Sequence, residues 1–520
     1  MSQFVNEPLT RIAEGTGIVL LGTTFGMLLG FAWRVLLARY FTQSEYGIFS
    51  LAVILLNVFV TISTLGIQEG ATRQIAYYRG KNDASKVKGI VLSSVQIALI
   101  ASIILSLTLF LTSNLISTKI FRTIELSAAL KILSIAIPFL ALIHILTSVF
   151  RGFGKVEPMV YFQALLTNGL FPLFLVPIIL LGMPFLNTIY AFLASIVLAC
   201  LSFVIYTIKK APLAVSFTRE KASTGVNPLG KELLFFSLPL LGVIMLNMIM
   251  QWTDTIMLGY LKLPEDVGLY NVALPLARLI LLPLASMGFI YVPVISQLFS
   301  QNLTEEMKRS YQVLTKWIFS LSFPLFLILF FFPEVSLNFL FGPRYTSASL
   351  ALRILSVGLI FHTFLGPNGL TLMIMGKTRL LMWVSLITAS LNITLNIGLI
   401  PLWGITGAAL ASLISYFAIN IFCSAKLYHL SRIHPFTKSY LKPIIASSMV
   451  MVVIYAVASH SLLVAWWMLP LFFILSIVIY GLSLLLTKGL DHEDINMLLA
   501  IEKRTGIKAT LIKRILKRFI

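Results

Sequence analysis

The sequence predicts an all-α polytopic membrane protein with about 14 transmembrane helices, on the basis of its composition, its apolar segments and an internal repeat. Hydrophobic residues make up 58% of the 520-residue chain and charged residues only 11%, whereas soluble domains carry about 25% charged residues. Most of the outer surface must therefore meet lipid. A hydrocarbon core about 30 Å thick requires roughly 20 apolar residues per helix.

Fourteen segments of this length follow one another along the chain. Turn-forming residues separate several of them, at Gly152–Pro158, Gly182–Pro184, Gly376-Lys377 and Pro401–Gly404. The segment centres lie near Met27, Asn57, Ala101, Phe139, Pro172, Leu193, Gly242, Leu282, Phe323, Phe361, Leu391, Leu413, Val453 and Ile474.

The net charge of +20 follows from membrane topology and does not require a nucleic acid partner. With the N-terminus placed in the cytoplasm, 30 of the 39 Lys and Arg residues fall inside, five fall outside and four lie within spans. The inside set includes Lys316. This bias predicts a protein of the cytoplasmic membrane with both termini in the cytoplasm.

An internal repeat relates the first six segments to the next six. Ala129–Ile137 is a near copy of Ala351–Leu359 at an offset of 222, and Glu45–Phe49 matches Asp266–Tyr270 at an offset of 221. Because six is even, both copies have the same orientation, and we expect two lobes around a central cavity. The expected parts are an N-lobe (1–230), a C-lobe (231–430), an accessory helix pair (431–487) and a basic cytoplasmic tail (488–520).

The end of the tail is amphipathic. Within 507–520, apolar residues occupy one face of a helix and five Lys and Arg residues occupy the other. This pattern predicts a helix that lies on anionic membrane lipid. A solvated helical tail is the alternative.

A longer motif carries a family resemblance. The string Ala38–Ser50, followed by Leu65-Gly66-Ile67, resembles the opening of polysaccharide transporters, the O-antigen-type oligosaccharide flippases of the MATE-like superfamily. Asp254–Gly259 and Gly268–Asn271 repeat the likeness in the second half. The resemblance covers roughly residues 15–430. It implies export of a lipid-linked oligosaccharide across the cytoplasmic membrane by alternating access.

Three charged residues inside the predicted spans, Arg34, Asp254 and Arg278, are candidate functional residues. Ionisable groups within a membrane are energetically unfavourable and are typical of substrate and ion pathways. Arg34 and Arg278 are expected to face the cavity and bind diphosphate or acidic sugars, since a guanidinium offers paired donors to phosphate. The resemblance agrees, because lipid II flippases also use arginines on helices one and eight. The repeat places Asp254 opposite Trp33, one residue from Arg34. A buried Arg278–Asp254 pair that only fixes packing is the alternative.

Neighbouring polar residues extend the candidate substrate site. Asn247, Gln251 and Asp254 follow at i, i+4 and i+7, which places them on one helix face. Asn271 shares a face with Arg278. Asp254 is alternatively the group that couples transport to protons or sodium, because burial moves the titration of a carboxyl group toward neutral pH.

Other polar residues in apolar segments have simpler explanations. Glu69 and Arg73 stand at i, i+4 near the end of the second segment, which predicts a local ion pair. Arg353 and its repeat partner Lys131 lie near helix ends and are expected to reach the membrane surface. The lone His144 and His362 are expected to serve packing.

Two other classes of protein are weighed against the flippase. A MATE-type cation-coupled drug antiporter needs acidic groups in its cavity, and Asp254 is the one clear acid there. A membrane glycosyltransferase or polymerase needs a catalytic acidic or metal site, and the sequence contains no Gly-rich phosphate loop, paired carboxylate motif or His/Cys metal spacing. We therefore expect no enzyme activity, no cofactor and no metal, and a protein that functions as a monomer.

Overall fold

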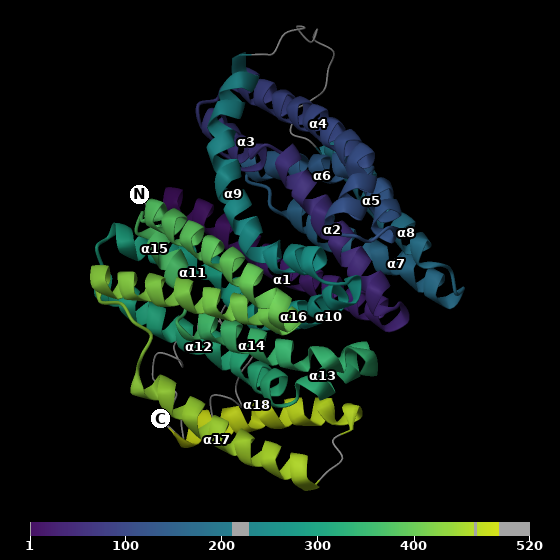
Figure 1. The fold of residues 1–520 in the computed structure, drawn as a ribbon. Coiled ribbons are helices and arrows are strands. Elements are labelled where there is room, and N and C mark those ends of the chain that lie inside the picture. The colour runs from purple at the N-terminus through teal and green to yellow at the C-terminus, as the bar shows by residue number, and fades with distance from the viewer. Residues whose placement is uncertain (1, 211–227, 462–464, 488–520) are drawn as a thin grey trace. The chain divides into compact units, whose positions relative to one another are not determined.

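The computed structural model describes residues 2–210, 228–461 and 465–487, and every regular element in these ranges is a helix (Figure 1). Twelve helices are long and apolar enough to cross a membrane. The predicted all-α polytopic membrane fold is confirmed. Packing divides the chain into two compact units, with the boundary after Asn271.

The first unit contains the elements that precede this boundary. They are α1 (Ser2–Tyr40), α2 (Gln43–Ser63), α3 (Ile67–Gly80), α4 (Ala84–Leu115), η1 (Ile116–Ile120), α5 (Glu125–Ser134), α6 (Ala136–Gly152), η2 (Met159–Leu166), α7 (Thr167–Leu180), α8 (Phe185–Lys210), α9 (Pro228–Leu261) and the start of α10 (Pro264–Arg278).

The second unit contains the end of α10 and the elements that follow. These are η4 (Leu279–Leu281), α11 (Leu282–Ser300), α12 (Thr304–Phe331), α13 (Pro333–Phe341), η5 (Pro343–Ala348), α14 (Ser349–Phe364), α15 (Asn368–Ile374), α16 (Thr378–Ser431), α17 (Lys438–Ser461), η6 (Trp466–Met468) and α18 (Leu469–Leu486).

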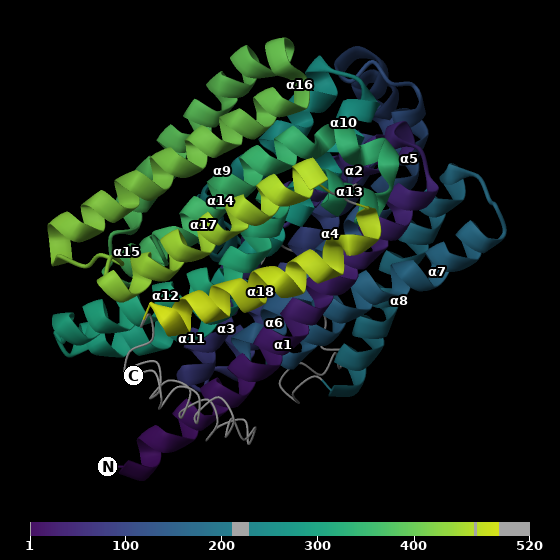
Figure 2. The ribbon, with the colours of Figure 1, turned by 90° about the horizontal axis from the view of Figure 1, so that it is seen from below.

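Two irregular features, the bent pair α5 and α6 and the long helix α16, account for the difference between twelve long helices and fourteen predicted spans. Helices α5 and α6 meet at a bend of 45° and are long and apolar enough to cross a membrane only when they are taken together as one span. Helix α16 has 54 residues, or about 80 Å at 1.5 Å per residue, far more than one span needs. Gly404 within it is non-helical, and a β-carbon at Gly407 would overlap the Leu399 carbonyl oxygen. The chain therefore reverses between two arms of α16 (Figure 2).

Small residues let α1 pack closely in the first unit. Gly22, Gly26 and Gly30 recur every four residues on the face that meets η2 and α7. A β-carbon at Gly22 would overlap Val160, and one at Gly26 would lie 2.7 Å from the Ala164 carbonyl oxygen. Such glycine stripes are typical of close helix pairs in membranes, where apolar burial alone gives no attraction between helices.

The second predicted span ends earlier than the sequence indicates. Helix α2 stops at Ser63, because Leu65 and Gly66 are left-handed, with φ of 48° and 73°. Helix α3 then begins at Ile67. The prediction that Glu69 and Arg73 end the second transmembrane helix is therefore wrong, since both lie in this separate helix.

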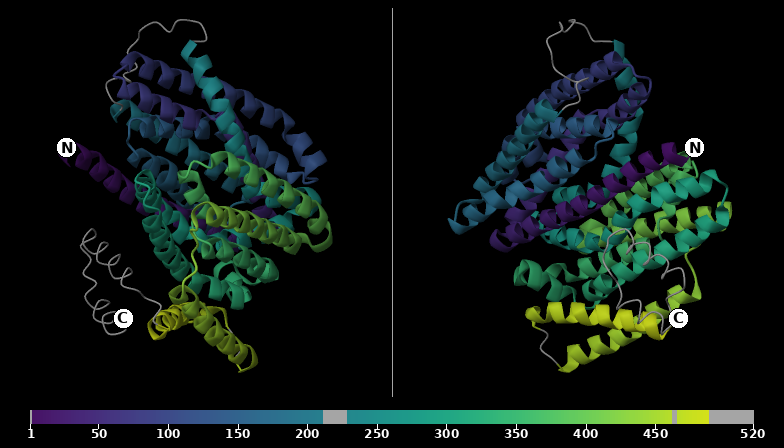
Figure 3. Two further views of the ribbon diagram at one scale, coloured as in Figure 1. Left: turned by 90° about the vertical axis from the view of Figure 1, so that its left-hand side faces the viewer. Right: turned by 180° about the vertical axis from the view of Figure 1, so that it is seen from behind.

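The second unit is built around α12, which packs against α11, α14, α17 and α18. Ring contacts join these helices: Phe332 stacks on Phe472 of α18 at 4.4 Å, and Phe319 meets Tyr440 of α17 edge-on at 5.4 Å. Helices α17 and α18, the predicted accessory pair, pack on each other (Figure 3). Lys316 lies within α12 with only 5% of its surface exposed, so its assignment to a connection is wrong. The amphipathic tail at 507–520 lies outside the described residues.

Replacing Gly26 with alanine should destabilise the protein by about 1–3 kcal/mol, because the new methyl group meets backbone that cannot turn away. Thermal unfolding in detergent would measure the change. Gly398→Ala is the matched control, since that helical glycine has nothing within 4 Å of a β-carbon. It should leave stability unchanged or raise it by up to about 1 kcal/mol. Equal melting temperatures for the two variants would contradict the packing described for α1.

Candidate functional site

Two glycines allow the backbones of α2 and α10 to meet. Gly47 and Gly268 are equivalent positions of the repeated motif. A β-carbon at Gly47 would overlap the Pro264 carbonyl oxygen, and one at Gly268 would overlap that of Gln43. Only glycine fits at either position, so the two copies of the motif cross each other at their glycines.

A capping box fixes the start of α2 next to this crossing. The Thr42 hydroxyl oxygen accepts a hydrogen bond from the Glu45 amide, and the Glu45 carboxylate accepts one from the Thr42 amide at 2.9 Å. The sequence Thr-Gln-Ser-Glu is the usual signature of such a cap. It sets the register in which the next residue, Tyr46, points toward α10.

A cluster of buried polar residues forms beside the crossing, and we call Tyr46, Asp254, Thr255, Tyr270 and Asn271 the polar cluster. The Tyr270 hydroxyl donates to Asp254 Oδ2 at 2.6 Å, and the Tyr46 hydroxyl donates to the Asn271 carbonyl oxygen at 3.0 Å. The Asn271 amide donates to the Val267 carbonyl oxygen at 2.9 Å and lies 3.4 Å from the Thr255 hydroxyl. Asp254 is 5% exposed and Asn271 is 8% exposed.

The repeat explains how the polar cluster arose. At an offset of 221, Trp33 corresponds to Asp254 and Phe49 corresponds to Tyr270. Trp33 and Phe49 meet edge-on with ring centroids 5.8 Å apart, and their counterparts meet through a hydrogen bond. The same two positions thus touch in both copies, once as an apolar pair and once as an acid with its donor.

Arg34 lies on α1, one residue after Trp33. Its Nη1 donates to the Gly30 carbonyl oxygen at 2.8 Å, and its guanidinium lies 4.5 Å from the centre of the Trp33 ring. A β-carbon at Gly30 would lie 3.1 Å from Asn168 Oδ1 and 3.5 Å from Arg34 Nη1. The Asn168 amide, on α7, is therefore a neighbour of the guanidinium that sequence reasoning missed.

Arg278 ends α10 at a helix break. The 3₁₀ turn η4 follows it, and Pro283 lies in the first turn of α11. Proline has no N–H to continue the α-helical bonds, which explains the break. The buried Ile280 carbonyl oxygen, within η4, accepts a hydrogen bond from the Ser322 hydroxyl at 2.7 Å. Arg278 belongs to the second unit, whereas Arg34 and Asp254 belong to the first.

The other two predicted site residues lie on α9. Gln251 is exposed, in contrast to the buried Asp254 one turn later. Asn247 lies in the same helix, and its side chain is outside the described part of the structure. Tyr46 and Tyr270 are additions to the prediction, since tyrosines inside apolar segments read as hydrophobic.

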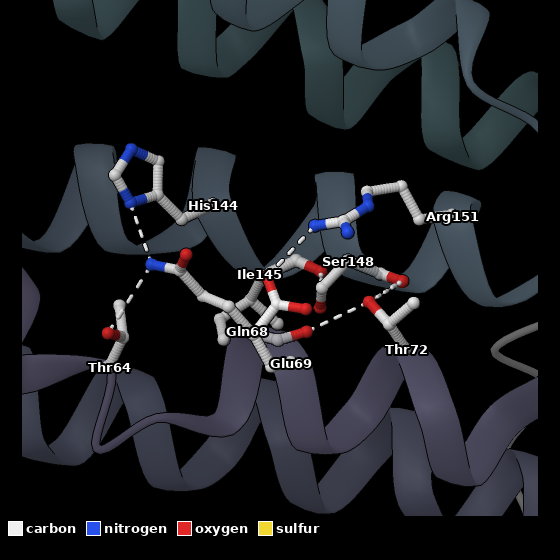
Figure 4. A network of polar contacts seen from close by, with 8 residues as sticks. All are labelled: Thr64, Gln68, Glu69, Thr72, His144, Ile145, Ser148 and Arg151. Atoms are coloured by element: carbon white, nitrogen blue, oxygen red, sulfur yellow. Dashed lines mark hydrogen bonds and ion pairs between the residues drawn. The ribbon is translucent and has the colours of Figure 1, made fainter. Parts of the chain in front are cut away.

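A second polar network joins α3 to α6 (Figure 4). Gln68 Nε2 lies 2.9 Å from His144 Nδ1, and Arg151 Nη1 lies 3.2 Å from Glu69 Oε1. The predicted Glu69–Arg73 ion pair is wrong, because the left-handed break turns α3 so that Glu69 faces α6. Arg73 instead lies 4.6 Å from the Phe236 ring centre.

Two further polar residues, His362 and Arg353, make contacts between helices of the second unit. His362 Nδ1 lies 2.7 Å from Asn420 Oδ1, and Arg353 Nε donates to the Phe330 carbonyl oxygen at 2.9 Å. These contacts connect α14 to α16 and to α12, and none of them involves a predicted site residue.

Two family models match the chain. The model of the polysaccharide biosynthesis protein family matches residues 12–299, more than half of the 520 residues. The chain belongs to the polysaccharide biosynthesis protein family. The family match includes Arg34, the polar cluster and Arg278. The MatE model matches residues 239–397.

Relatives of this polysaccharide biosynthesis family member align over part of their length. An uncharacterized membrane protein of Methanocaldococcus jannaschii is 34% identical over 179 residues, 34% of this chain and 35% of that protein. A probable low-salt glycan biosynthesis flippase of Haloferax volcanii is 27% identical over 169 residues, 32% of this chain and 36% of that protein. The chain thus spans about a third of the length of the curated relatives it matches.

Solved structures share the fold of this family member. The lipid II flippase MurJ in an inward closed conformation aligns with a TM-score of 0.70 at 17% identity, over 91% of this chain and 98% of that chain. An inward-facing multidrug resistance MATE transporter aligns with a TM-score of 0.63 at 18% identity, over 78% and 96%. The chain is therefore a multi-pass membrane protein with the fold of these transporters.

Replacing Tyr270 with phenylalanine should lower the stability of the protein by about 1–3 kcal/mol, because a buried carboxylate loses a hydrogen-bond donor. Thermal unfolding in detergent would measure the loss. Tyr260→Phe on α9, where the ring is 51% exposed, is the control and should leave the melting temperature unchanged. The same melting temperature for both variants would show that the Asp254–Tyr270 bond contributes nothing.

Proposed function

We propose that this protein exports a lipid-linked oligosaccharide across the cytoplasmic membrane by alternating access, with both termini in the cytoplasm. The observation that carries the proposal is the polar cluster, which lies in membrane-spanning helices of a fold shared with a lipid II flippase. Polar and ionisable side chains in spans are unfavourable and are typical of substrate and ion pathways. Family membership supports the link to polysaccharide synthesis.

In this proposal the arginines bind the diphosphate. Arg34 lies beside the Asn168 amide, and Arg278 lies where a span is broken by a 3₁₀ turn. Discontinuous helices in transporters are typical of substrate sites, because their ends expose backbone groups to the ligand. Asn247, Gln251 and Asn271 would contribute hydrogen bonds to sugar hydroxyls.

The proposed organisation follows the repeat. Two six-helix lobes, 1–230 and 231–430, would enclose the cavity, with 431–487 as the accessory pair and the tail helix at 507–520 lying on anionic lipid. Transport breaks no covalent bond, so the proposal requires neither a catalytic residue nor a cofactor, and one copy of the chain suffices. The Haloferax volcanii relative, described as a probable flippase, supports transport over an enzymatic role.

A MATE-type cation antiporter is the second candidate, and the MatE match to residues 239–397 favours it. Asp254 is buried within that match and would bind the organic cation. Uptake of a cationic dye by proteoliposomes would separate the two functions. Dye transport that is lost in Asp254→Asn, without transport of a lipid-linked sugar, would establish the antiporter.

Arg278→Ala should reduce flipping about tenfold or more, because charge-assisted hydrogen bonds contribute about 1.5–3 kcal/mol. Proteoliposomes containing a fluorescent polyprenyl-diphosphate sugar, bleached by external dithionite, report flipping directly. Arg34→Ala should act in the same direction. Arg344→Ala, an exposed arginine in η5, is the control. Wild-type flipping by Arg278→Ala at equal protein content would contradict phosphate binding.

Asp254→Asn tests the coupling role. If the carboxylate couples transport to an ion, the variant should no longer respond to an imposed proton or sodium gradient, because an amide does not titrate. The same proteoliposomes would be assayed with and without each gradient. Asp83→Asn at the N-cap of α4 is the control, since asparagine caps helices as well as aspartate. A gradient response retained by Asp254→Asn would exclude coupling and leave substrate binding.

A further inference from the structure

A cavity of about 480 Å³ lies in the second unit. Its walls come from α12, from the residue after α14, from the end of α16 and from the connection to α17, and they include Tyr311, Leu365, Tyr428 and Phe436. The volume falls in the range of small-molecule sites. The connection at 432–437 joins two candidate membrane spans, so we expect this part of the cavity wall to lie near a membrane surface.

Arg432 directly precedes the cavity-lining residue Ile433 and has an unusual conformation. It ends α16 with φ of 57°, in the left-handed region where glycine is usual, and its amide donates to the Tyr428 carbonyl oxygen at 2.8 Å. The guanidinium lies 5.2 Å from the Tyr428 ring centre. The backbone alone would favour glycine here, so the conformation gives no reason for an arginine.

His434 supplies a second observation at the same cavity. It lines the cavity, and its Nδ1 is buried without a hydrogen-bond partner in the described structure. Its carbonyl oxygen accepts a hydrogen bond from Gln312 at 3.1 Å, which fixes the backbone of the connection. A buried polar atom without a partner is unfavourable, and an oxygen of a bound ligand would satisfy it.

We propose that this cavity binds a membrane phospholipid with an anionic headgroup, distinct from the transported substrate. The phosphate would lie between Arg432 and His434, and a hydrocarbon chain would fill the cavity. Tyr428 and Phe436 are 46% and 42% exposed at the rim, as aromatic residues at a membrane surface usually are. The positive charge of Arg432 favours an anion and disfavours the basic segment 507–520 of this chain as the occupant.

The variant Arg432→Gly tests the proposal without endangering the fold, since glycine suits the left-handed position. Arg122→Gly is the matched control, because Arg122 is also left-handed, with φ of 52°, and lies in the other unit. Delipidated protein would be titrated with phosphatidylglycerol or phosphatidylcholine, with the melting temperature as readout. Ala425→Phe, which places a ring in the cavity wall, is a second test.

Wild-type protein and Arg122→Gly should be stabilised by phosphatidylglycerol at lower concentration than by phosphatidylcholine. Arg432→Gly should need about tenfold more phosphatidylglycerol, and Ala425→Phe should lose the response. A photoactivatable phosphatidylglycerol should label a peptide within 424–436. Equal responses of Arg432→Gly and Arg122→Gly would overturn the proposal. So would labelling of 424–436 that only a polyprenyl-diphosphate sugar competes away, because the cavity would then belong to the substrate.

Discussion

The backbone contact between Gly47 and Gly268 is the constraint on which the candidate site depends. Each glycine faces a carbonyl oxygen of the other helix, and a methyl group at either position would overlap it. This contact brings α2 close enough for the Tyr46 hydroxyl to reach the Asn271 carbonyl oxygen. Helices in lipid associate through close packing and hydrogen bonds, because lipid is as apolar as their side chains. The crossing uses both.

The duplication gives the site its frame, and the differences between the copies give it chemistry. Trp33 and Phe49 belong to an aromatic group that also includes Phe171 and Phe192. In the second copy the same two positions hold Asp254 and Tyr270. An ionisable group introduced alone into a span would be unfavourable, and the tyrosine hydroxyl at the equivalent aromatic position supplies a hydrogen bond to it. The aspartate at the position equivalent to Trp33 is thus stabilised by the tyrosine at the position equivalent to Phe49.

The sequence predicts the fold well because the apolar segments, the turn-forming residues between them and the internal repeat can all be read without knowing which helices are in contact. The reversal at Gly404 and the fourteen spans follow from them. The break after Ser63 was missed because a left-handed Leu65 leaves no pattern in an apolar run. The partners of Glu69 and Asp254 were missed for another reason, since they come from other helices. The offset of 221 pairs Phe49 with Tyr270, but only the structure shows that these positions contact Trp33 and Asp254.

The composition of the chain limits which groups can contact its Lys and Arg side chains. Lys and Arg number 39 and Asp and Glu number 19, so carboxylates cannot pair with most of them. Carbonyl oxygens and ring faces also contact cations. Arg34 donates to the Gly30 carbonyl oxygen and lies over the Trp33 ring, and Arg353 makes both kinds of contact with Phe330. A guanidinium has five N–H donors, so a carbonyl bond and a ring contact remain compatible with phosphate binding. A carbonyl oxygen or a ring face orients a guanidinium without neutralising its charge, and that charge is what would attract a diphosphate.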